Sequence, residues 1–453
     1  MTIFLVVLFC LCIFFPSLHL LHCLPWFKDQ DEGKRIRIEK KKGISILVPC
    51  YNEQNIVETS VHSMKSLSYS AFEVIYINDG STDQTLSSLH QLLDLRSYTT
   101  SPLKKLSHEK VNNLYQSKRY PHIYVLDKEN GGKADALNAG IEFSKKDLVV
   151  TLDADTILTD EALSVVNDTF EDKDIVAAGG MVHVLQTKTS KPLHYLSLLR
   201  TNMLVRVQTL DFLKAFYINK VSLARFRSLA VISGAFGIFR KEVLLNAGGY
   251  RKTIGEDIDI TLSIHRYISK YKNKKIIFLP EAVGYTELPE CWKDLFKQRV
   301  RWQKAFIDCL FHFRSFFGKT LISKAVSFFY VVESFVAGTM ATYITTIIVI
   351  INAIINPPSS YAFFILFYAG YIFIFSLAYN LMAVRMGKYY GFTFHKKKEK
   401  VYLLLTIFFD IFIYRFVTIY FVLYGSVAYF FNKDWNKVER TGRNYQDNIG
   451  PVA

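Results

Sequence analysis

The sequence predicts an α/β domain with a doubly wound, mostly parallel sheet, flanked by transmembrane helices. Strand-like apolar runs alternate with helix-like segments between residues 43 and 290, as in folds with a parallel sheet. Polar side chains follow the ends of several of these runs. Long apolar runs lie near both ends of the chain, and clusters of Lys and Arg stand beside them, which is typical of membrane proteins.

The composition fits a membrane protein with a reduced, cytosolic part. The chain has 453 residues, a net charge of +15 and 50% hydrophobic residues. This length allows two or three domains. High charge and high apolar content are compatible if basic residues stand beside membrane spans, so we expect a membrane lipid partner and no nucleic acid polymer. The six cysteines form no CxxC pair and no disulfide framework.

Residues 1–26 carry no charged side chain and are expected to form an N-terminal transmembrane anchor. They lack the basic start and the small-residue cleavage site of a secretory signal peptide, which is the alternative. The basic residues that follow are Lys28, Lys34, Arg35, Arg37, Lys40, Lys41 and Lys42. By the positive-inside rule, that side of the membrane and the domain that follows are cytosolic.

Residues 325–431 are expected to form three transmembrane helices, because each of three apolar runs can span about 30 Å of hydrocarbon. These runs are Ala325–Ile355, Ser359–Val384 and Val401–Phe431. The basic loop 385–400 is predicted to be cytosolic, which makes this a multi-pass cell-membrane protein with its tail, 432–453, outside. Glu333, Asp410 and Arg415 are expensive in lipid and are expected to face a bundle interior or a polar path; snorkelling or mutual pairing is the alternative.

Residues 43–290 are expected to form one cytosolic domain of repeated strand–helix units. The predicted strands are Ile44–Pro49, Glu73–Asn78, His122–Asp127 and Leu148–Leu152. The predicted helices carry the stripe Val57, Val61, Met64 and Leu67, or span Leu86–Leu95 and Ala134–Phe143. Residues 96–120 are polar and aperiodic, and we expect an insertion loop there.

Polar groups follow each of the four predicted strands. They lie in Pro49-Cys-Tyr-Asn-Glu53, Asn78-Asp-Gly-Ser-Thr-Asp83, Asn130-Gly-Gly-Lys-Ala-Asp135 and Asp153-Ala-Asp155. Open α/β sheets bind ligands at the carboxyl ends of their strands, so we expect these groups to converge on one crevice. Neither G-x-G-x-x-G nor a P-loop is present, so these nucleotide-binding motifs are not indicated.

Asp153 and Asp155 are the candidate metal ligands. In an extended chain, side chains two residues apart point the same way, so one cation can contact both. A few carboxylates with phosphates completing the shell are how Mg²⁺ or Mn²⁺ is usually held. An Asx turn after a strand is the alternative interpretation of this pair taken alone.

Two later motifs extend the pattern: Gly255-Glu-Asp257, which opens the predicted helix Asp257–Tyr267, and Gln298-Arg-Val-Arg-Trp302. With all six motifs in order, residues 43–305 resemble family 2 inverting glycosyltransferases of the processive, membrane-embedded kind. The resemblance implies a GT-A type glycosyltransferase domain at 43–290. It also implies an amphipathic interface segment at 291–319 that carries the Q-x-x-R-W motif.

The resemblance also implies roles for individual residues. The catalytic base is Asp257, and the contacts to the nucleotide-sugar donor are Glu53, Asp79, Lys133 and Asp135. The metal site is Asp153 and Asp155, with Asp155 as the direct ligand of Mg²⁺ or Mn²⁺. The residues that cover the diphosphate and meet the acceptor are Gln298, Arg299, Arg301 and Trp302. The loop near the acceptor terminus is Ser233-Gly-Ala-Phe-Gly237. Anchoring at the membrane interface is an alternative role for Trp302, because residues 292–313 are aromatic, basic and amphipathic.

The sequence Gly255-Glu-Asp-Ile-Asp-Ile-Thr261 is most like that of bacterial poly-β-1,6-N-acetylglucosamine synthases. This likeness implies a UDP-N-acetylglucosamine donor, a growing β-linked polysaccharide and a small membrane partner subunit. Gln303-Lys-Ala305 departs from the Gly-containing run usual in those synthases, so hyaluronan, chitin and cellulose-type synthases stay open. A non-processive transferase to a lipid acceptor generally lacks Q-x-x-R-W. An inactive scaffold is disfavoured by the intact acids.

Overall fold

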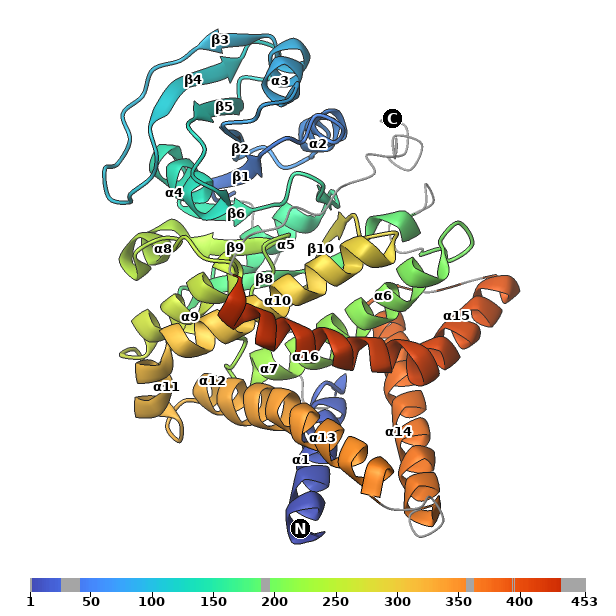
Figure 1. The fold of residues 1–453 in the computed structure, drawn as a ribbon. Coiled ribbons are helices and arrows are strands. Elements are labelled where there is room, and N and C mark those ends of the chain that lie inside the picture. The colour runs from blue at the N-terminus through green and yellow to red at the C-terminus, as the bar shows by residue number, and fades with distance from the viewer. Residues whose placement is uncertain are drawn as a thin grey trace. The chain divides into compact units, whose positions relative to one another are not determined.

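The structure, a computed structural model, describes residues 2–25, 41–188, 196–355, 362–392, 394 and 396–432 (Figure 1). The chain divides into two compact units. In the described residues, the sheet unit comprises 41–188 and 229–288, and the helical unit comprises 2–25, 196–228 and 289–432. Five of the basic residues after the first apolar run, from Lys28 to Lys40, and the predicted tail beyond residue 432 lie outside the described residues.

The sheet unit contains ten strands within its described residues, in the order β3-β4-β5-β2-β1-β6-β9-β8-β10-β7. The strands are β1 Ile44–Cys50, β2 Phe72–Asp79, β3 Leu95–Ser97, β4 Val111–Ser117, β5 Ile123–Lys128, β6 Leu148–Thr151, β7 Ile157–Leu158, β8 Ile175–Val184, β9 Gly237–Arg240 and β10 Lys275–Thr286. The helices are α2 Val57–Lys65, α3 Thr85–Leu93, α4 Lys133–Phe143, α5 Ala162–Thr169, the short 3₁₀ turn η3 Leu185–Thr187, α8 Lys241–Ala247 and α9 Glu256–Ile268.

Strands β5, β2, β1 and β6 are parallel neighbours and form the part of the sheet that the sequence predicted. All eight residues of β2 are buried, as expected for a strand covered on both faces. The register aligns Cys50 with Asn78 and Asp79 with Lys128. The polar segments that follow these strands therefore begin at one edge of the sheet.

The prediction of a mostly parallel sheet is wrong, because the sheet is mixed. Strand β9 runs antiparallel between β6 and β8, and β3, β4 and β7 also pair in antiparallel fashion. The sequence analysis assigned no strand after residue 152. Short strands such as β7 and β9 give too few alternations of polar and apolar residues to be recognised from sequence.

The predicted insertion loop at 96–120 is also wrong in part, because it contains β4 and most of β3. Strand β3 stands at the end of the strand order, and β4 lies between β3 and β5. Much of β4, Val-Asn-Asn-Leu-Tyr-Gln-Ser, remains accessible to solvent. A polar strand of this kind lacks the apolar run by which buried strands are recognised.

In the described residues of the helical unit, all regular elements are helices. These are α1 Thr2–His22, α6 Met203–Leu213, η4 Lys214–Lys220, α7 Val221–Arg225, α10 Trp292–His312, α11 Arg314–Thr320, α12 Ala325–Phe328, η5 Phe329–Met340, α13 Ala341–Ile355, α14 Ala362–Tyr389, α15 Lys397–Phe409, η7 Asp410–Tyr414 and α16 Arg415–Phe431. Segments η4, η5 and η7 are π-helical and continue the α-helices on either side of them. Such segments are rare in proteins, and those that occur are often found at functional sites.

Two helical stretches in the described residues are long and apolar enough to cross a membrane, Ala325–Ile348 and Lys397–Phe431. They coincide with the first and third of the predicted C-terminal spans. The other two predicted spans fall on α1 and α14, and their crossing of the membrane stays a prediction.

The charged residues in these runs have polar partners inside the helical unit. The Oε1 atom of Glu333 lies 2.7 Å from Nε2 of His19 on α1. The Oδ2 atom of Asp410 lies 2.9 Å from Nζ of Lys214. Arg415 donates a hydrogen bond of 2.7 Å to Ser376. The expectation that these residues face a bundle interior or a polar path is met by Asp410, which is buried, and by Glu333, which is partly buried. It is not met by Arg415, which is exposed.

The pair Gly179-Gly180 in β8 offers a test of how the segment before β9 is held. The backbone N–H of Gly180 donates to the carbonyl of Phe236 at 3.1 Å, and a Cβ on Gly180 would overlap the buried Phe236 ring. We predict that Gly180→Ala destabilises the protein by about 1–3 kcal/mol through this overlap, measured as thermal unfolding of the full chain in detergent.

Gly179→Ala is the matched control, because its Cβ would meet nothing closer than 3.8 Å. Equal melting temperatures for the two variants would contradict the packing argument.

Candidate active site

The carboxylate of Asp79 organises the loop between β5 and α4. One oxygen accepts hydrogen bonds from Lys128 Nζ at 2.7 Å and from the Gly131 N–H at 3.0 Å. The other accepts from the Gly132 N–H at 2.7 Å and from Asn130 Nδ2 at 3.3 Å. Gly132 has a φ of +91°, which glycine adopts without strain. This loop immediately precedes Lys133.

Lys128, which the sequence analysis did not single out, is the buried centre of this arrangement. Its side chain is fully buried, and Nζ also lies 2.6 Å from Asp135 Oδ1. Asp135 in turn accepts hydrogen bonds from the Glu109 N–H. A buried ammonium needs such compensation. Two predicted donor-contact residues, Asp79 and Asp135, are thus joined through one lysine.

Lys133 joins two of the predicted motifs. Its Nζ lies 2.7 Å from Asp153 Oδ1 and 3.0 Å from Glu256 Oε1. Burial lowers the pKa of Lys133, but Asp153, Glu256 and Asp257 outweigh it and raise the pKa overall, so the ammonium stays charged. The space beside Lys133 is kept by Gly234, whose Cβ would lie 2.8 Å from Nζ and 3.8 Å from Asp257 Cβ. The predicted acceptor loop therefore reaches the same place.

Asp257 is half-buried and stands in the first turn of α9. Its Oδ1 accepts a hydrogen bond of 2.8 Å from the Ile258 N–H, and the helix N-terminus favours its charged form. Thr261 Oγ1 donates to the Asp257 carbonyl at 2.6 Å and accepts from the Ile232 N–H at 3.0 Å. The start of α9 is thereby fastened to the segment that leads into Ser233–Gly237.

Asp153 and Asp155 follow β6 and fit a metal that is held mainly by its substrate. Asp155 is buried, and its Oδ1 accepts a hydrogen bond from Thr286 at 3.1 Å. Among the described residues, no three His, Cys, Asp or Glu side chains form a complete metal site. Mg²⁺ is usually bound through one or two carboxylates with phosphates and waters, and this donor set matches that chemistry.

Glu53 lies beyond β1 in a segment that is tied to the one after β2. Its backbone N–H donates to Thr85 Oγ1 at 2.8 Å. The preceding Asn52 adopts a φ of +54°, and its side chain accepts from the Thr82 N–H at 2.8 Å. The predicted donor residues Glu53 and Asp79 therefore stand on cross-linked loops.

The Q-x-x-R-W residues lie on α10 of the helical unit. Gln298, Arg299 and Arg301 are partly buried, and Trp302 is 40% exposed. The Arg299 guanidinium carbon lies 4.6 Å from the centre of the Trp302 ring, which is a cation–π contact.

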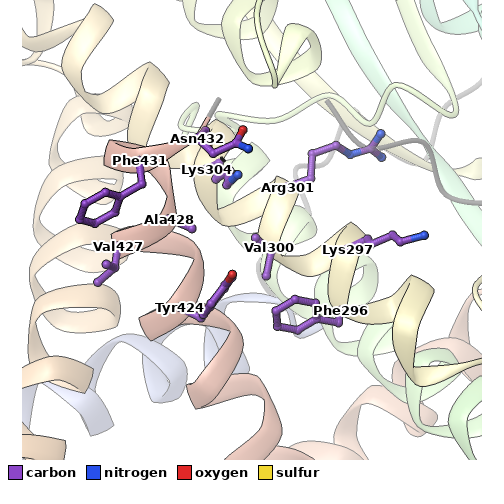
Figure 2. Close-up of a pocket in the computed structure, with 10 residues that line it drawn as sticks. All are labelled: Phe296, Lys297, Val300, Arg301, Lys304, Tyr424, Val427, Ala428, Phe431 and Asn432. Carbon is purple, nitrogen blue, oxygen red and sulfur yellow. Dashed lines mark hydrogen bonds between the residues drawn. The ribbon is translucent and has the colours of Figure 1, made fainter. Parts of the chain in front are cut away.

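A pocket of about 300 Å³ opens between α10 and α16 (Figure 2). Its lining combines apolar and basic side chains: Phe296, Lys297, Val300, Arg301, Lys304, Tyr424, Val427, Ala428, Phe431 and Asn432. Phe296 and Tyr424 lie between the two helices, with ring centres 5.1 Å apart, whereas Lys297 and Arg301 extend away from α16.

The sequence analysis missed two residues of the site, Lys128 and Glu256. Glu256 lies inside the Gly255-Glu-Asp257 motif, and this position carried a usable signal. Lys128 directly follows a predicted strand, where a lysine is usually solvated, so its position carried no such signal. The sequence motifs of the sheet unit come together: Lys133 contacts Asp153 and Glu256, and Glu256 adjoins Asp257.

Known families match both units. The sequence model of glycosyl transferase family 2 matches residues 45–246, and that of glycosyl transferase family group 2 matches residues 148–432. A poly-beta-1,6-N-acetyl-D-glucosamine synthase of Staphylococcus aureus strain MSSA476 is 28% identical over 284 residues, which are 62% of this chain and 58% of that protein. The synthase of that name from Staphylococcus epidermidis is 26% identical over 340 residues, which are 74% of this chain and 72% of that protein.

A solved structure shares the fold. It is a mannosyltransferase from Pyrobaculum calidifontis in complex with GDP-Man and Mn²⁺, with a TM-score of 0.56 and 15% identity, and the match covers 90% of this chain and 97% of that one. The chain spans less than two thirds of the length of the Staphylococcus aureus relative. The match at residues 148–432 covers more than half of the chain, and the chain therefore belongs to glycosyl transferase family group 2, which confirms its identification as a family 2 glycosyltransferase.

Proposed function

We propose that this chain is an inverting, processive glycosyltransferase that polymerises UDP-N-acetylglucosamine into a β-linked polysaccharide at the membrane. The observation that carries the proposal is the position of Lys133, which contacts Asp153 and Glu256 beside Asp257. A cation for a diphosphate, a metal-binding carboxylate and a base are thus close together. The names of the Staphylococcus relatives support the choice of donor.

The donor end of the reaction needs positive charge, because a nucleoside diphosphate leaves as the glycosidic bond breaks. Lys133 remains charged and is only partly exposed, so it can exchange a carboxylate for a phosphate oxygen. Asp155, with Asp153, would hold Mg²⁺ or Mn²⁺, which supplies further positive charge to the diphosphate. The Mn²⁺ in the structurally similar mannosyltransferase supports this assignment. Glu53 and Asp79 stand on the loops assigned to the nucleotide.

The acceptor end of the reaction needs a base. The acceptor hydroxyl attacks the anomeric carbon, the bond from that carbon to the diphosphate breaks, and the hydroxyl proton passes to Asp257. Attack from the side opposite the leaving group inverts the anomeric centre, so an α-linked donor gives a β-glycoside. The exposed ring of Trp302 can stack on a sugar ring of the acceptor, and Gln298 and Arg301 lie on the same helix, α10.

A panel of labelled nucleotide sugars tests the proposal. Membranes containing the chain are incubated with each sugar in the presence of Mg²⁺ or Mn²⁺, and the product is digested with linkage-specific hydrolases. We expect polymer from UDP-N-acetylglucosamine, cleaved by a β-1,6-specific enzyme, and none in excess chelator, because Asp155 then lacks its metal. Asp155→Ala should behave like the chelated wild type. Full turnover in chelator would refute metal dependence, and polymer from a different sugar would refute the donor assignment.

Asp257→Asn tests the base. Asn keeps the size and the hydrogen-bond acceptor for the Ile258 N–H, so α9 should still form, but it cannot take the proton. We expect polymer synthesis to fall by about 10²–10⁴ with UDP-sugar affinity retained, both measured on one preparation. Near-normal synthesis would remove Asp257 from the mechanism, and loss of donor binding would move it to the donor site.

Asp259→Asn is the control for this experiment. It removes the same charge two residues later on α9, but there the buried Asp259 carboxylate pairs with the partly exposed Arg251, 2.7 Å away. We expect it to lower stability without lowering the turnover of the folded enzyme by such a factor.

We further propose a multi-pass arrangement in the cell membrane with the catalytic unit in the cytosol. The basic residues behind the first span and in the loop 385–400 support it. Reporter fusions at residues 45 and 392 should score cytosolic, and one at residue 357 external. A cytosolic score at 357 would mean that Ala325–Ile355 lies on the membrane or re-enters it.

A further inference from the structure

A chain of charged side chains inside the helical unit leads from Arg299 of the Q-x-x-R-W motif to side chains that the proposed chemistry does not use. It connects α10, which carries Q-x-x-R-W, to the candidate membrane span Lys397–Phe431. We name it the Asp410 network, and its members are Arg299, Asp211, Lys214, Asp410 and Asn380.

The network alternates in charge along its length. Lys214 Nζ lies 2.9 Å from Asp410 Oδ2 and 3.1 Å from Asp211 Oδ1. The other oxygen of Asp211 lies 3.4 Å from a terminal nitrogen of Arg299. Asn380 on α14 donates to Asp410 Oδ2 at 2.9 Å. Four continuous helices therefore meet through one set of ion pairs and hydrogen bonds: α6–η4, α10, α14 and α15–η7–α16.

The two central members stand at matching places in their helices. Lys214 is the first residue of the π-helical segment η4, and Asp410 is the first residue of η7. Burial lowers the pKa of Lys214, but Asp211 and Asp410 outweigh it and raise the pKa overall, so the ammonium group of Lys214 stays charged. Removing one partner would leave a buried charge without compensation, and the geometry is therefore strongly constrained.

The network ends on Trp302. Arg299 lies 4.6 Å from the centre of the Trp302 ring, and its side chain is 17% exposed. A guanidinium that is held by Asp211 can lie over the indole in only a few orientations. The exposed ring is therefore packed on one face against a group whose position depends on Asp211 and, through it, on Lys214.

We propose that the Asp410 network positions Trp302, so that the candidate membrane span carrying Asp410 is linked to the sugar-binding ring of the Q-x-x-R-W motif. The members of the network are positioning residues. This inference rests on the proposed function for the role of Trp302 in holding the acceptor, but the link between the network and the ring can be measured without any reaction.

The first measurement is the fluorescence anisotropy of Trp302 in the purified full-length chain, with the other three tryptophans replaced as Trp26→Phe, Trp292→Phe and Trp435→Phe. Lys214→Met in this background should lower the anisotropy. Without Lys214, Asp211 no longer holds Arg299 in one position, and the Trp302 ring beside Arg299 becomes more mobile. Lys214→Arg keeps the charge and should restore the wild-type value. Lys220→Met removes a lysine from the same π-helical segment and serves as the matched control, with no change expected.

The second measurement separates the two substrates in the chain with its native tryptophans. Lys214→Met should raise the KM for a short β-linked oligosaccharide acceptor about threefold to tenfold, the effect of losing about one ordinary hydrogen bond. The KM for the UDP-sugar should not change. If Lys214→Met does not accumulate, Asp211→Asn removes the partner of Arg299 directly and should give both effects.

The outcomes are distinguishable. Unchanged anisotropy in both Lys214→Met and Asp211→Asn would overturn the inference. Lower anisotropy with an unchanged acceptor KM would overturn the link to the acceptor. A wild-type chain that makes no polymer, while its Trp302 anisotropy still responds to Lys214→Met, would refute the proposed function and leave the positioning intact.

Discussion

The candidate site depends on the two ion pairs that the ammonium group of Lys133 makes with Asp153 and Glu256. Lys133 opens α4, and it contacts Asp153 after β6 and Glu256 at the start of α9. Without it, two carboxylates would face each other at short range, and their repulsion would push α9 and the end of β6 apart. The lysine therefore holds α9, which carries the proposed base Asp257, close to Asp153 of the proposed metal pair before any substrate arrives, which is the condition for electrostatic preorganisation.

The four parallel strands and the polar groups at their ends could be predicted from sequence. The burial of Lys128 and the antiparallel strands could not. Strands β1, β2, β5 and β6 are apolar runs followed by polar groups, so periodicity and the strand-end rule place Asp79 and Asp153 at one edge. Lys128 looks from sequence like a solvated residue at a strand end. It is buried only because Asp79 and Asp135 reach it, and Asp79 is 49 residues away in the chain. Strands β3, β4, β7 and β9 escaped prediction because they are short or polar, whereas β8 is a buried run of ten residues that was missed.

The ion-pair partners of the charged residues in the helical unit could not be predicted from sequence either. Their cost in an apolar run marks Glu333 and Asp410 as paired, but their partners, His19 and Lys214, stand 314 and 196 residues away. Each of the π-helical segments in the described part of the chain carries a member of these pairs: Lys214 in η4, Glu333 in η5 and Asp410 in η7. A π-turn widens the helix locally, and we infer that it allows each buried charge to reach its partner.

Two lysine–aspartate pairs of the site differ in how deeply they are buried, and we infer that they therefore have different roles. In the pair Lys128–Asp79 the side chains are 0% and 3% exposed, and in the pair Lys133–Asp153 they are 29% and 25% exposed. The Lys128–Asp79 pair is inaccessible to solvent, and Asp79 already accepts four hydrogen bonds, so neither side chain can take a substrate group as a new partner. Breaking the pair would leave a buried charge. A half-exposed pair can exchange a carboxylate for a phosphate at small cost, because water already competes for both groups. We infer that Asp79 serves the nucleotide by fixing the loop 130–132, and that Lys133 is the lysine that meets the diphosphate.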